Sequence, residues 1–508
     1  MSHPPMTARE LDYRPRLHFT ATRNWLNDPN GLVFSAGVYH LFFQYNPRGV
    51  EHGHMSWGHA TSRDLLRWTE HEVALPERET HSIYSGSAVT DWWNTSALAA
   101  TGATEPPLVA MYTGHRGAAP SRPQREAQFL ACSLDAGRTW RYPLDTPVLD
   151  EAASDFRDPK VLWHPETQRW VMVLVRPNER QVAFYTSTNL RNWTPESTFG
   201  PAGNTAGIWE VPDLFALHDA RGERHWVLKV DFNPGGPNGG SGGQYFIGSF
   251  DGRAFQAQTP PQTIDYGHDF YAALTWSGLD FEPTGQTGNA PDDRTSDPAP
   301  GRPGSNRPRL EYPTWIAWMN NWQYAARLPT APWKGALSLP RALSLRDTPE
   351  GLRLAQHPVK QFEALRGEPR GLSGTLGAQT LRPGCAHEVQ LSWPATAQPF
   401  SLQLLSTERE EARLDVNPAG GELRVTRPNP AAGEPPPGFA GMVTAPIPAG
   451  AGRLRLIVDA CSLEVFAAHG TMCLTELFFP AAPLTRLELA ALPGVEGQIW
   501  PLATTRAG

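Results

Sequence analysis

Four segments of the chain share one layout: HATSRDLLRW (residues 59–68), LACSLDAGRTW (130–140), FYTSTNLRNW (184–193) and FIGSFDGRAF (246–255). Each contains a short β-forming run, then Ser, then an acidic or amide residue typical of a tight turn, and finally an aromatic residue. The closing aromatic residues recur about every 60 residues, which is enough chain for four short strands and their loops. A repeat of this kind predicts the blades of a β-propeller.

The length of the repeating region sets the number of blades. Residues 12–350 have room for five blades, and no long amphipathic helix interrupts them. We therefore expect an all-β fold that begins with a five-bladed β-propeller. Residues 282–311 break the pattern, because proline, glycine and polar residues dominate there and no aromatic residue occurs. This composition predicts an exposed, disordered insertion between two strands.

The pattern changes beyond residue 350. Residues 351–367 are expected to form a linker with a short helix. Residues 368–508 contain many short stretches of alternating apolar and polar residues, separated by loops rich in Gly and Pro. This arrangement predicts a C-terminal β-sandwich. The sequence leaves two roles open for this domain: covering an edge of the propeller, which we expect, or binding carbohydrate.

Composition and charge narrow the class of function. The chain has 44 Lys and Arg against 51 Asp and Glu, a net charge of −7, and no basic stripe, which argues against nucleic acid or an anionic membrane as partners. The four cysteines show no C-x-x-C pairing, so neither a zinc site nor a disulfide framework is expected. No metal or organic cofactor is implied. The N-terminus as given has no apolar signal region, which predicts a cytoplasmic protein, or a secreted one if the true start lies upstream.

Three carboxylates stand in unusual local sequences: Asp28 in WLNDPNG, Asp158 in DFRDPK and Glu210 in IWEVPDLF. Each precedes the closing aromatic residue of its blade by about 40 residues, which predicts a position near the first strand of that blade. The first strand of a blade lines the central channel, so three blades would direct carboxylates into one axial cavity. Clustered like charges are costly and push pKa values apart, which indicates acid and base catalysis.

These motifs, together with three others, resemble a known enzyme family. WLNDPNG, FQYNP (residues 43–47), WGHATS (57–62), YSGS (84–87), RDP (157–159) and WEVPDLF (209–215) resemble, in order, the motif set of glycoside hydrolase family 32, which contains invertases, levanases and inulinases. DACSLEVF (459–466) is similar to a strand of the family's sandwich domain. Val211, Tyr84 and Leu26 stand where the family more often has Cys, Phe and Met, and none of these differences removes a carboxylate.

The resemblance implies a role for each carboxylate. Asp28 corresponds to the nucleophile, Asp158 to the transition-state stabiliser and Glu210 to the general acid/base of a retaining hydrolysis through a covalent fructosyl-enzyme. The residues implied in substrate binding are Trp25, Asn27, Gln44, Trp57, Tyr84, Ser85, Arg157 and Trp322. The expected activity is exo cleavage of terminal fructose from levan, inulin, fructo-oligosaccharides and sucrose.

Three alternative functions share parts of this sequence pattern. An arabinofuranosidase or xylosidase of family 43 has a similar set of acids but inverts, and WLNDPNG and WEVPDLF argue against it. A fructosyltransferase has the same site and a different acceptor, so sequence does not separate it from a hydrolase. A non-catalytic sugar-binding propeller is expected to lack at least one carboxylate. The preferred substrate and the oligomeric state are left open.

Overall fold

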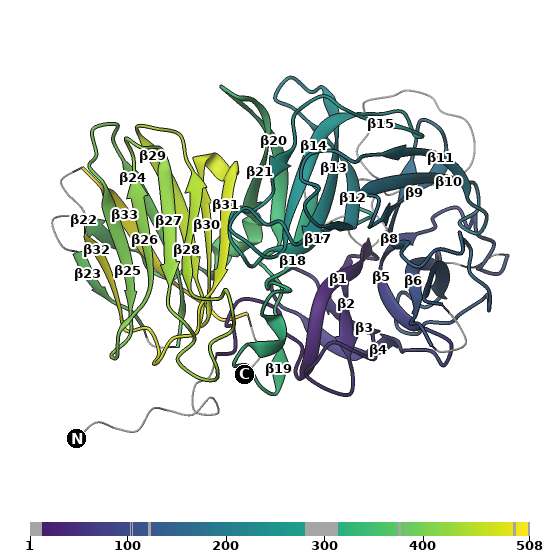
Figure 1. Cartoon of the computed structure of the whole chain (residues 1–508), viewed down its shortest axis with the longest axis horizontal. Helices are drawn as coiled ribbons and strands as arrows, with labels where there is room; N and C mark the ends of the chain where they lie inside the picture. Colours follow the sequence, from purple (N-terminus) through teal and green to yellow (C-terminus); the bar gives the residue numbers. More distant parts are fainter. Residues whose placement is uncertain are drawn as a thin grey trace, which may run out of the picture.

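The computed structural model describes residues 13–101, 103, 105–119, 123–279, 313–373, 377–382, 384–490 and 494–505. The regular secondary structure of the described residues is almost entirely β-strand, and the strands form a five-bladed propeller and a β-sandwich packed side by side (Figure 1). The insertion predicted at residues 282–311 lies outside the described residues. Within them, no helix is both long enough and apolar enough to cross a membrane.

The five blades are antiparallel sheets that follow one another along the chain. The first two blades contain β1 (Asn24–Ser35), β2 (Val38–Asn46), β3 (Ser56–Ser62) and β4 (Thr69–Leu75), and then β5 (Ser82–Thr90), β6 (Leu108–Arg116) and β7 (Arg125–Ser133). The third and fourth contain β8 (Arg157–His164), β9 (Arg169–Arg176), β10 (Gln181–Ser187) and β11 (Thr194–Phe199), and then β12 (Ile208–His218), β13 (Arg224–Asn233), β14 (Gly242–Phe250), β15 (Phe255–Ala257) and β16 (Gln262–Thr263). The fifth contains β17 (Tyr271–Thr275), β18 (Thr314–Trp318), β20 (Arg341–Thr348) and β21 (Gly351–Pro358).

The sequence repeat corresponds to the turn that follows the third strand of a blade. In the first blade, Ser62 Oγ accepts a hydrogen bond from the Leu65 amide at 2.8 Å, and Asp64 Oδ1 accepts one from the Arg67 amide at 2.8 Å. In the third blade, Asn189 Oδ1 accepts from the Arg191 amide at 3.0 Å. A short polar side chain that binds the backbone two or three residues ahead fixes such a turn. This recurring bond explains why the motif identified the blades.

The innermost strands β1, β5, β8, β12 and β17 contact one another around the propeller axis. The short strand β19 (Trp333–Lys334), which follows the fifth blade's β18, pairs in parallel with β1 and so joins the last blade to the first. Each innermost strand is buried along most of its length, as expected of strands covered on both faces.

Every innermost strand also contains a β-bulge at an equivalent position. In β8, Arg157 pairs with Val175 and Lys160 with Val173, so the inner strand has one more residue than its partner. The same one-residue excess occurs in β1, β5, β12 and β17. A bulge redirects side chains and is frequent beside active sites. Five equivalent bulges therefore form a ring of redirected side chains around the axis.

The sandwich consists of two six-stranded sheets packed face to face over an apolar core. One sheet has the order β22 (Arg370–Ser373), β33 (Glu496–Leu502), β24 (Ala386–Trp393), β29 (Gly452–Val458), β30 (Ser462–Ala467) and β31 (Met472–Leu477). The other has the order β23 (Gly377–Thr380), β32 (Arg486–Ala490), β25 (Phe400–Leu405), β26 (Glu410–Asn417), β27 (Glu422–Arg427) and β28 (Gly441–Pro446). Strand β31 lies at the edge nearest the propeller (Figure 1).

One predicted boundary requires correction. The linker was expected at residues 351–367, but β21 occupies residues 351–358 and pairs along its whole length with β20. The connection therefore begins after Pro358 and contains the short 3-10 helix η2 (Lys360–Leu365). The error arose because the fifth blade lacks the Ser–Asp–aromatic turn that marks the other four blades.

Candidate active site

The three predicted carboxylates lie at the bulges of three innermost strands. Asp28 is on β1, Asp158 on β8 and Glu210 on β12. The negative charges of Asp28 and Glu210 both raise the pKa of Asp158, and that of Glu210 raises the pKa of Asp28, so the three groups act on one another electrostatically. The structure thus brings residues 182 positions apart in sequence, from Asp28 to Glu210, into one site.

Asp28 is buried and bound by neutral donors. Its Oδ2 accepts a hydrogen bond from Ser85 Oγ at 2.7 Å, and its Oδ1 accepts one from Asn27 Nδ2 at 3.1 Å. Burial raises the pKa of Asp28 to about 6, although the bonds from Ser85 and Asn27 oppose the rise. These two neutral donors orient the carboxylate, and no cationic side chain among the described residues donates a hydrogen bond to it.

Asp158 occupies a strained backbone position. Its φ angle is 63°, a left-handed value that is uncommon for a residue with a side chain. Its amide donates to Thr113 Oγ1 at 2.9 Å, and its Oδ2 accepts from the Val211 amide at 2.9 Å. Burial raises the pKa of Asp158 to about 8 against the opposing charge of Arg157. Strain held in this way is typical of a functional site.

Glu210 is held through both carboxylate oxygens. Arg157 Nη2 donates to its Oε1 at 3.0 Å, and the Tyr271 hydroxyl donates to its Oε2 at 2.5 Å. Arg157 is in turn bound by Glu126, whose Oε2 lies 3.3 Å from Arg157 Nη1. No motif in the sequence indicates Tyr271 or Glu126 as a residue of this site. Tyr271 is the first residue of β17, so extending the register of the first strands to the fifth blade would have found it.

Aromatic rings surround the carboxylates. Trp25 and Trp322 stack with their ring centroids 6.1 Å apart, and the His52 ring packs edge-on against both. The half-buried Tyr84 stacks on His115 at 4.2 Å. An aromatic face can pack on the C–H face of a sugar ring, so Trp322 and Tyr84 have the character of pocket walls. Trp25 itself is 1% exposed, and its indole N–H donates to Asn27 Oδ1 at 2.7 Å, which fixes the residue before Asp28.

Two predicted binding residues lie behind the pocket wall. Trp57 is fully buried, and its indole N–H donates to the Tyr84 carbonyl at 3.0 Å. Gln44 is also buried, and its Nε2 donates to the Ile83 carbonyl at 3.1 Å. Both side chains therefore support the bulge of β5, which carries Tyr84 and Ser85.

A layer of buried polar side chains lies beneath the carboxylates, one from each innermost strand: Asn30, Ser87, Lys160, Asp213 and Thr275. Lys160 Nζ lies 3.2 Å from Asp213 Oδ1 and donates to the Thr275 carbonyl at 2.6 Å. The Thr275 amide donates to Asp213 Oδ2 at 2.6 Å. These bonds connect β8, β12 and β17, which belong to three different blades.

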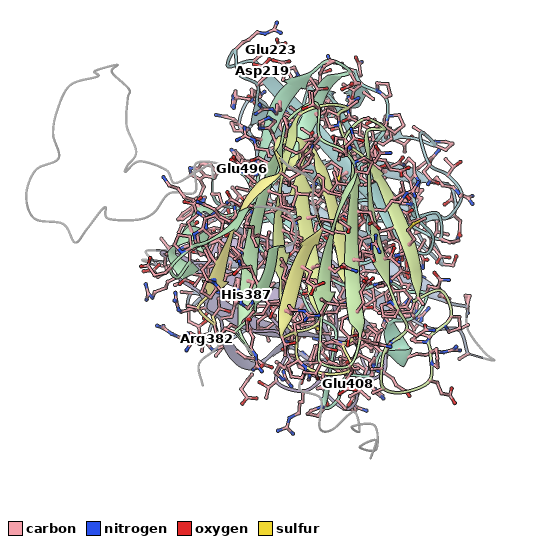
Figure 2. The ribbon with its side chains drawn as sticks, turned by 90° about the vertical axis from the view of Figure 1, so that its left-hand side faces the viewer. Asp219, Glu223, Arg382, His387, Glu408 and Glu496 are labelled. Atoms are coloured by element: carbon pink, nitrogen blue, oxygen red, sulfur yellow. The ribbon has the colours of Figure 1, made fainter. Side chains whose placement is uncertain are left out.

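Two other features of the described residues are separate from this site. Asp219, Glu223 and His225 place ligand atoms within 4.8 Å of one another around the β12–β13 turn. Figure 2 shows Asp219 and Glu223 at one end of the molecule. Asp219 Oδ1 already accepts hydrogen bonds from the amides of Arg221 and Glu223, at 2.9 Å each, which identifies the group as part of a turn. No resident metal is implied by this arrangement.

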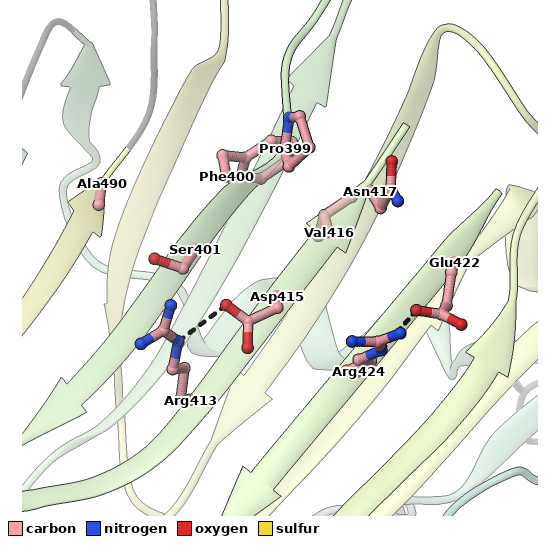
Figure 3. Close-up of a pocket in the computed structure, with 10 residues that line it drawn as sticks. All are labelled: Pro399, Phe400, Ser401, Arg413, Asp415, Val416, Asn417, Glu422, Arg424 and Ala490. Atoms are coloured by element: carbon pink, nitrogen blue, oxygen red, sulfur yellow. Dashed lines mark hydrogen bonds and ion pairs between the residues drawn. The ribbon is translucent and has the colours of Figure 1, made fainter. Parts of the chain in front are cut away.

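The second feature is a shallow hollow of about 300 Å³ on the sandwich (Figure 3). Its charged side chains pair with one another, Arg413 with Asp415 and Arg424 with Glu422. Its one aromatic residue, Phe400, is 4% exposed. The hollow therefore offers no ring on which a sugar could stack.

Comparison with known proteins gives one family for both domains. Residues 18–284 and 308–358 match the glycosyl hydrolases family 32 N-terminal domain, and residues 351–501 match the glycosyl hydrolases family 32 C-terminal domain. The chain is 39% identical over 505 residues to a levanase of Bacillus subtilis (strain 168), which covers 95% of this chain and 69% of the levanase. It is 35% identical over 541 residues to an extracellular exo-inulinase of Aspergillus awamori, covering 97% of this chain and 95% of that protein.

Solved structures agree with this assignment. The crystal structure of the exo-inulinase from Aspergillus awamori superposes with a TM-score of 0.84 at 34% identity and covers 97% of this chain and 99% of its own. A β-fructofuranosidase from Schwanniomyces occidentalis, complexed with fructosyl-erythritol, superposes with a TM-score of 0.83 at 27% identity, covering 98% and 99%. The family 43 alternative is thereby set aside. The chain belongs to glycosyl hydrolase family 32 and is a glycoside hydrolase.

Proposed function

We propose that this protein is a retaining exo-β-fructosidase, which removes terminal β-D-fructofuranosyl residues from fructans, fructo-oligosaccharides and sucrose. The observation that carries the proposal is the convergence of Asp28, Asp158 and Glu210 on one site at the bulges of three innermost strands. The levanase and exo-inulinase relatives support a β-fructoside as the substrate.

The surroundings of each carboxylate support a different task. Asp28 has neutral hydrogen-bond donors only, which leaves its charge available for attack on C2 of the fructosyl unit. Glu210 is oriented by Arg157 and Tyr271, as a group that must deliver a proton to the leaving oxygen and later accept one from water. The Asp158 side chain is fixed by the amide of Val211, and it is proposed to stabilise the charge that develops on the sugar ring.

The buried layer beneath the carboxylates supports exo cleavage. Lys160, Asp213 and Thr275 are 5% exposed or less and connect three blades, so a long chain has no passage through the channel. A pocket with such a floor accepts a chain end. The proposed products are therefore free fructose and a fructan shortened by one residue.

Glu210→Ala tests the acid/base assignment. Rates should be compared on sucrose, which has a poor leaving group, and on an aryl β-fructofuranoside, whose leaving group needs little protonation. We expect about a 10³-fold loss of kcat on sucrose, a much smaller loss on the aryl substrate, and formation of fructosyl azide when azide is added. Equal losses on both substrates would contradict the assignment.

Product analysis tests exo cleavage and retention. Chromatography at early times on inulin and levan should show fructose from the first turnovers. A ladder of di- and trisaccharides before fructose would indicate an open groove and an endo enzyme. NMR of the first product should show the β-furanose anomer, because two inversions restore the starting configuration. Initial release of the opposite anomer would exclude the covalent intermediate.

A further inference from the structure

The loop of residues 264–270 belongs to the propeller and contacts the sandwich. It leads from the fourth blade into β17 and runs beside β31, the edge strand of the sandwich, because the Tyr266 amide donates to the Cys473 carbonyl at 2.8 Å. The Asp269 amide donates to the Thr475 carbonyl at 3.1 Å. A Cβ at Gly267 would lie 1.9 Å from the same carbonyl oxygen, so only glycine permits this approach. The loop therefore covers the edge strand as an additional strand does.

Side chains fix the same contact. Arg427, at the end of β27, donates through Nη1 to Asp269 Oδ2 at 2.7 Å, and the Leu477 amide donates to the same oxygen at 2.8 Å. The Tyr324 hydroxyl donates to Asp269 Oδ1 at 2.5 Å. Arg427 also pairs with Glu476 at 2.9 Å. Asp269, Arg427 and Tyr324 are each 2% exposed or less, so solvent does not weaken these bonds.

Two residues of the pocket are close in sequence to the residues of this contact. Tyr271 follows Asp269 by two residues, and its hydroxyl donates to Glu210 Oε2 at 2.5 Å. Trp322 precedes Tyr324 by two residues and stacks on a neighbouring indole of the pocket. Arg427 contacts both segments, because its Nη1 donates to Asp269 Oδ2 and its Nη2 donates to the Tyr324 hydroxyl at 2.8 Å.

We propose that Arg427 and Asp269 form a positioning pair, through which the sandwich holds the Tyr271 hydroxyl against Glu210. The inference rests on the proposed function, in which Glu210 is the acid/base. A hydroxyl displaced by a fraction of an ångström no longer orients the carboxylate that must protonate the leaving oxygen. The sandwich thus contributes to catalysis by fixing the position of Tyr271, without contact with the substrate.

The dependence of the rate on the leaving group shows whether the pair of Arg427 and Asp269 positions Tyr271 or only stabilises the fold. Loss of support lowers the amount of folded enzyme and reduces the rates on all substrates equally. Loss of positioning reduces the rate on sucrose more than the rate on an activated aryl β-fructofuranoside, because only sucrose requires full protonation of its leaving group. The ratio of kcat on sucrose to kcat on the aryl substrate is therefore the measurement.

Asp269→Asn is the test variant, because it keeps the size of the side chain and leaves Arg427 paired with Glu476. We expect the ratio to fall about tenfold, as in Tyr271→Phe. In the double variant Asp269→Asn/Tyr271→Phe the ratio should be no lower than in Tyr271→Phe alone, because both changes act through the same hydroxyl. If Asp269→Asn does not fold, Arg427→Lys, which keeps the charge and loses the planar fork, decides the question by the same ratio.

Asp459→Asn is the matched control at the same domain boundary. Asp459 accepts hydrogen bonds from the amides of Arg16 and Leu17 and has no bond to residues 264–270. It should lower the melting temperature and leave the ratio unchanged. A wild-type ratio in Asp269→Asn, with a lowered ratio in Tyr271→Phe, would overturn the positioning pair. A wild-type ratio in both Tyr271→Phe and Glu210→Ala would instead overturn the proposed function.

Discussion

Two buried carboxylates, Asp28 in the propeller pocket and Glu464 at the domain boundary, differ in the sign of their pKa shifts. Burial raises the pKa of Asp28 in the pocket to about 6. Burial also raises the pKa of Glu464 at the boundary, but Arg341 and His18 lower it by more, to about 2. Both carboxylates are less than 9% exposed, so their partners, and not their depth, decide the outcome.

The partners explain this difference. Glu464 accepts hydrogen bonds from His18 Nε2 at 2.8 Å and from Arg341 Nε at 3.0 Å, so its charge is balanced on both oxygens. The donors to Asp28 are a hydroxyl and an amide. Asp269 lies between the two cases, because burial raises its pKa although Arg427 is in contact. Balanced charges join the domains, whereas an unbalanced charge in the pocket is kept at a cost in stability for use in chemistry.

Removal of the pocket carboxylate should produce the largest effect. In Asp28→Ala we expect kcat to fall by about 10⁴-fold or more, because no other group can form the covalent intermediate. The melting temperature should not fall, since the change removes an unbalanced buried charge. Steady-state rates on sucrose and a thermal melt at pH 7 provide the check. A folded variant with about a tenth of the wild-type rate would show that Asp28 is not the nucleophile.

Removal of the Glu464 charge at the domain boundary should lower the stability of the protein and leave kcat unchanged. Glu464→Gln leaves the buried Arg341 and His18 with one balancing charge fewer, and we expect the free energy of unfolding to fall by about 3–5 kcal/mol. The pKa of Glu464 is lowered, so its contribution is present above its unfolded pKa and is lost as the pH falls toward 2. Denaturant titration at pH 6 measures the loss. Unchanged stability there would mean that these charges do not hold the boundary.

The sequence predicted the propeller because its signal is local. Ser62 and Asp64 bind backbone amides within five residues of each other, so the turn leaves a motif that recurs in the other blades. Distance from that motif then placed Asp28, Asp158 and Glu210 near the first strands. The roles of these three residues still came from resemblance, since spacing does not distinguish an acid from a nucleophile.

The residues that were missed act over long separations in sequence. Tyr271 reaches Glu210 across 61 positions, and Arg427 reaches Asp269 across 158. Neither residue lies in a repeating motif, and in a sequence each reads as an ordinary strand residue. The contact of β17 with β12 brings Tyr271 to Glu210, and the packing of the sandwich against the propeller brings Arg427 to Asp269. Trp57 shows the reverse case, because its motif marked it for substrate contact and the fold buries it completely.

The smallest expected effect follows from the sign of the Asp28 shift. An aspartate in an unfolded chain has a pKa of 3.8, and burial raises the pKa of Asp28 in the folded protein to about 6. Between these values the folded state keeps a proton that the unfolded state has lost, so raising the pH favours unfolding until the folded group is also ionised. The penalty is absent below pH 4 and complete above about pH 6, where two pKa units correspond to about 2–3 kcal/mol. Asp28→Asn removes the titration and should therefore be more stable than the wild type at pH 7 by up to this amount, and equally stable at pH 4. Denaturant titrations of both proteins at the two pH values measure the difference. A variant that is less stable than the wild type at pH 7 would show that the Asp28 charge is balanced in the pocket, and the contrast with Glu464 would be lost.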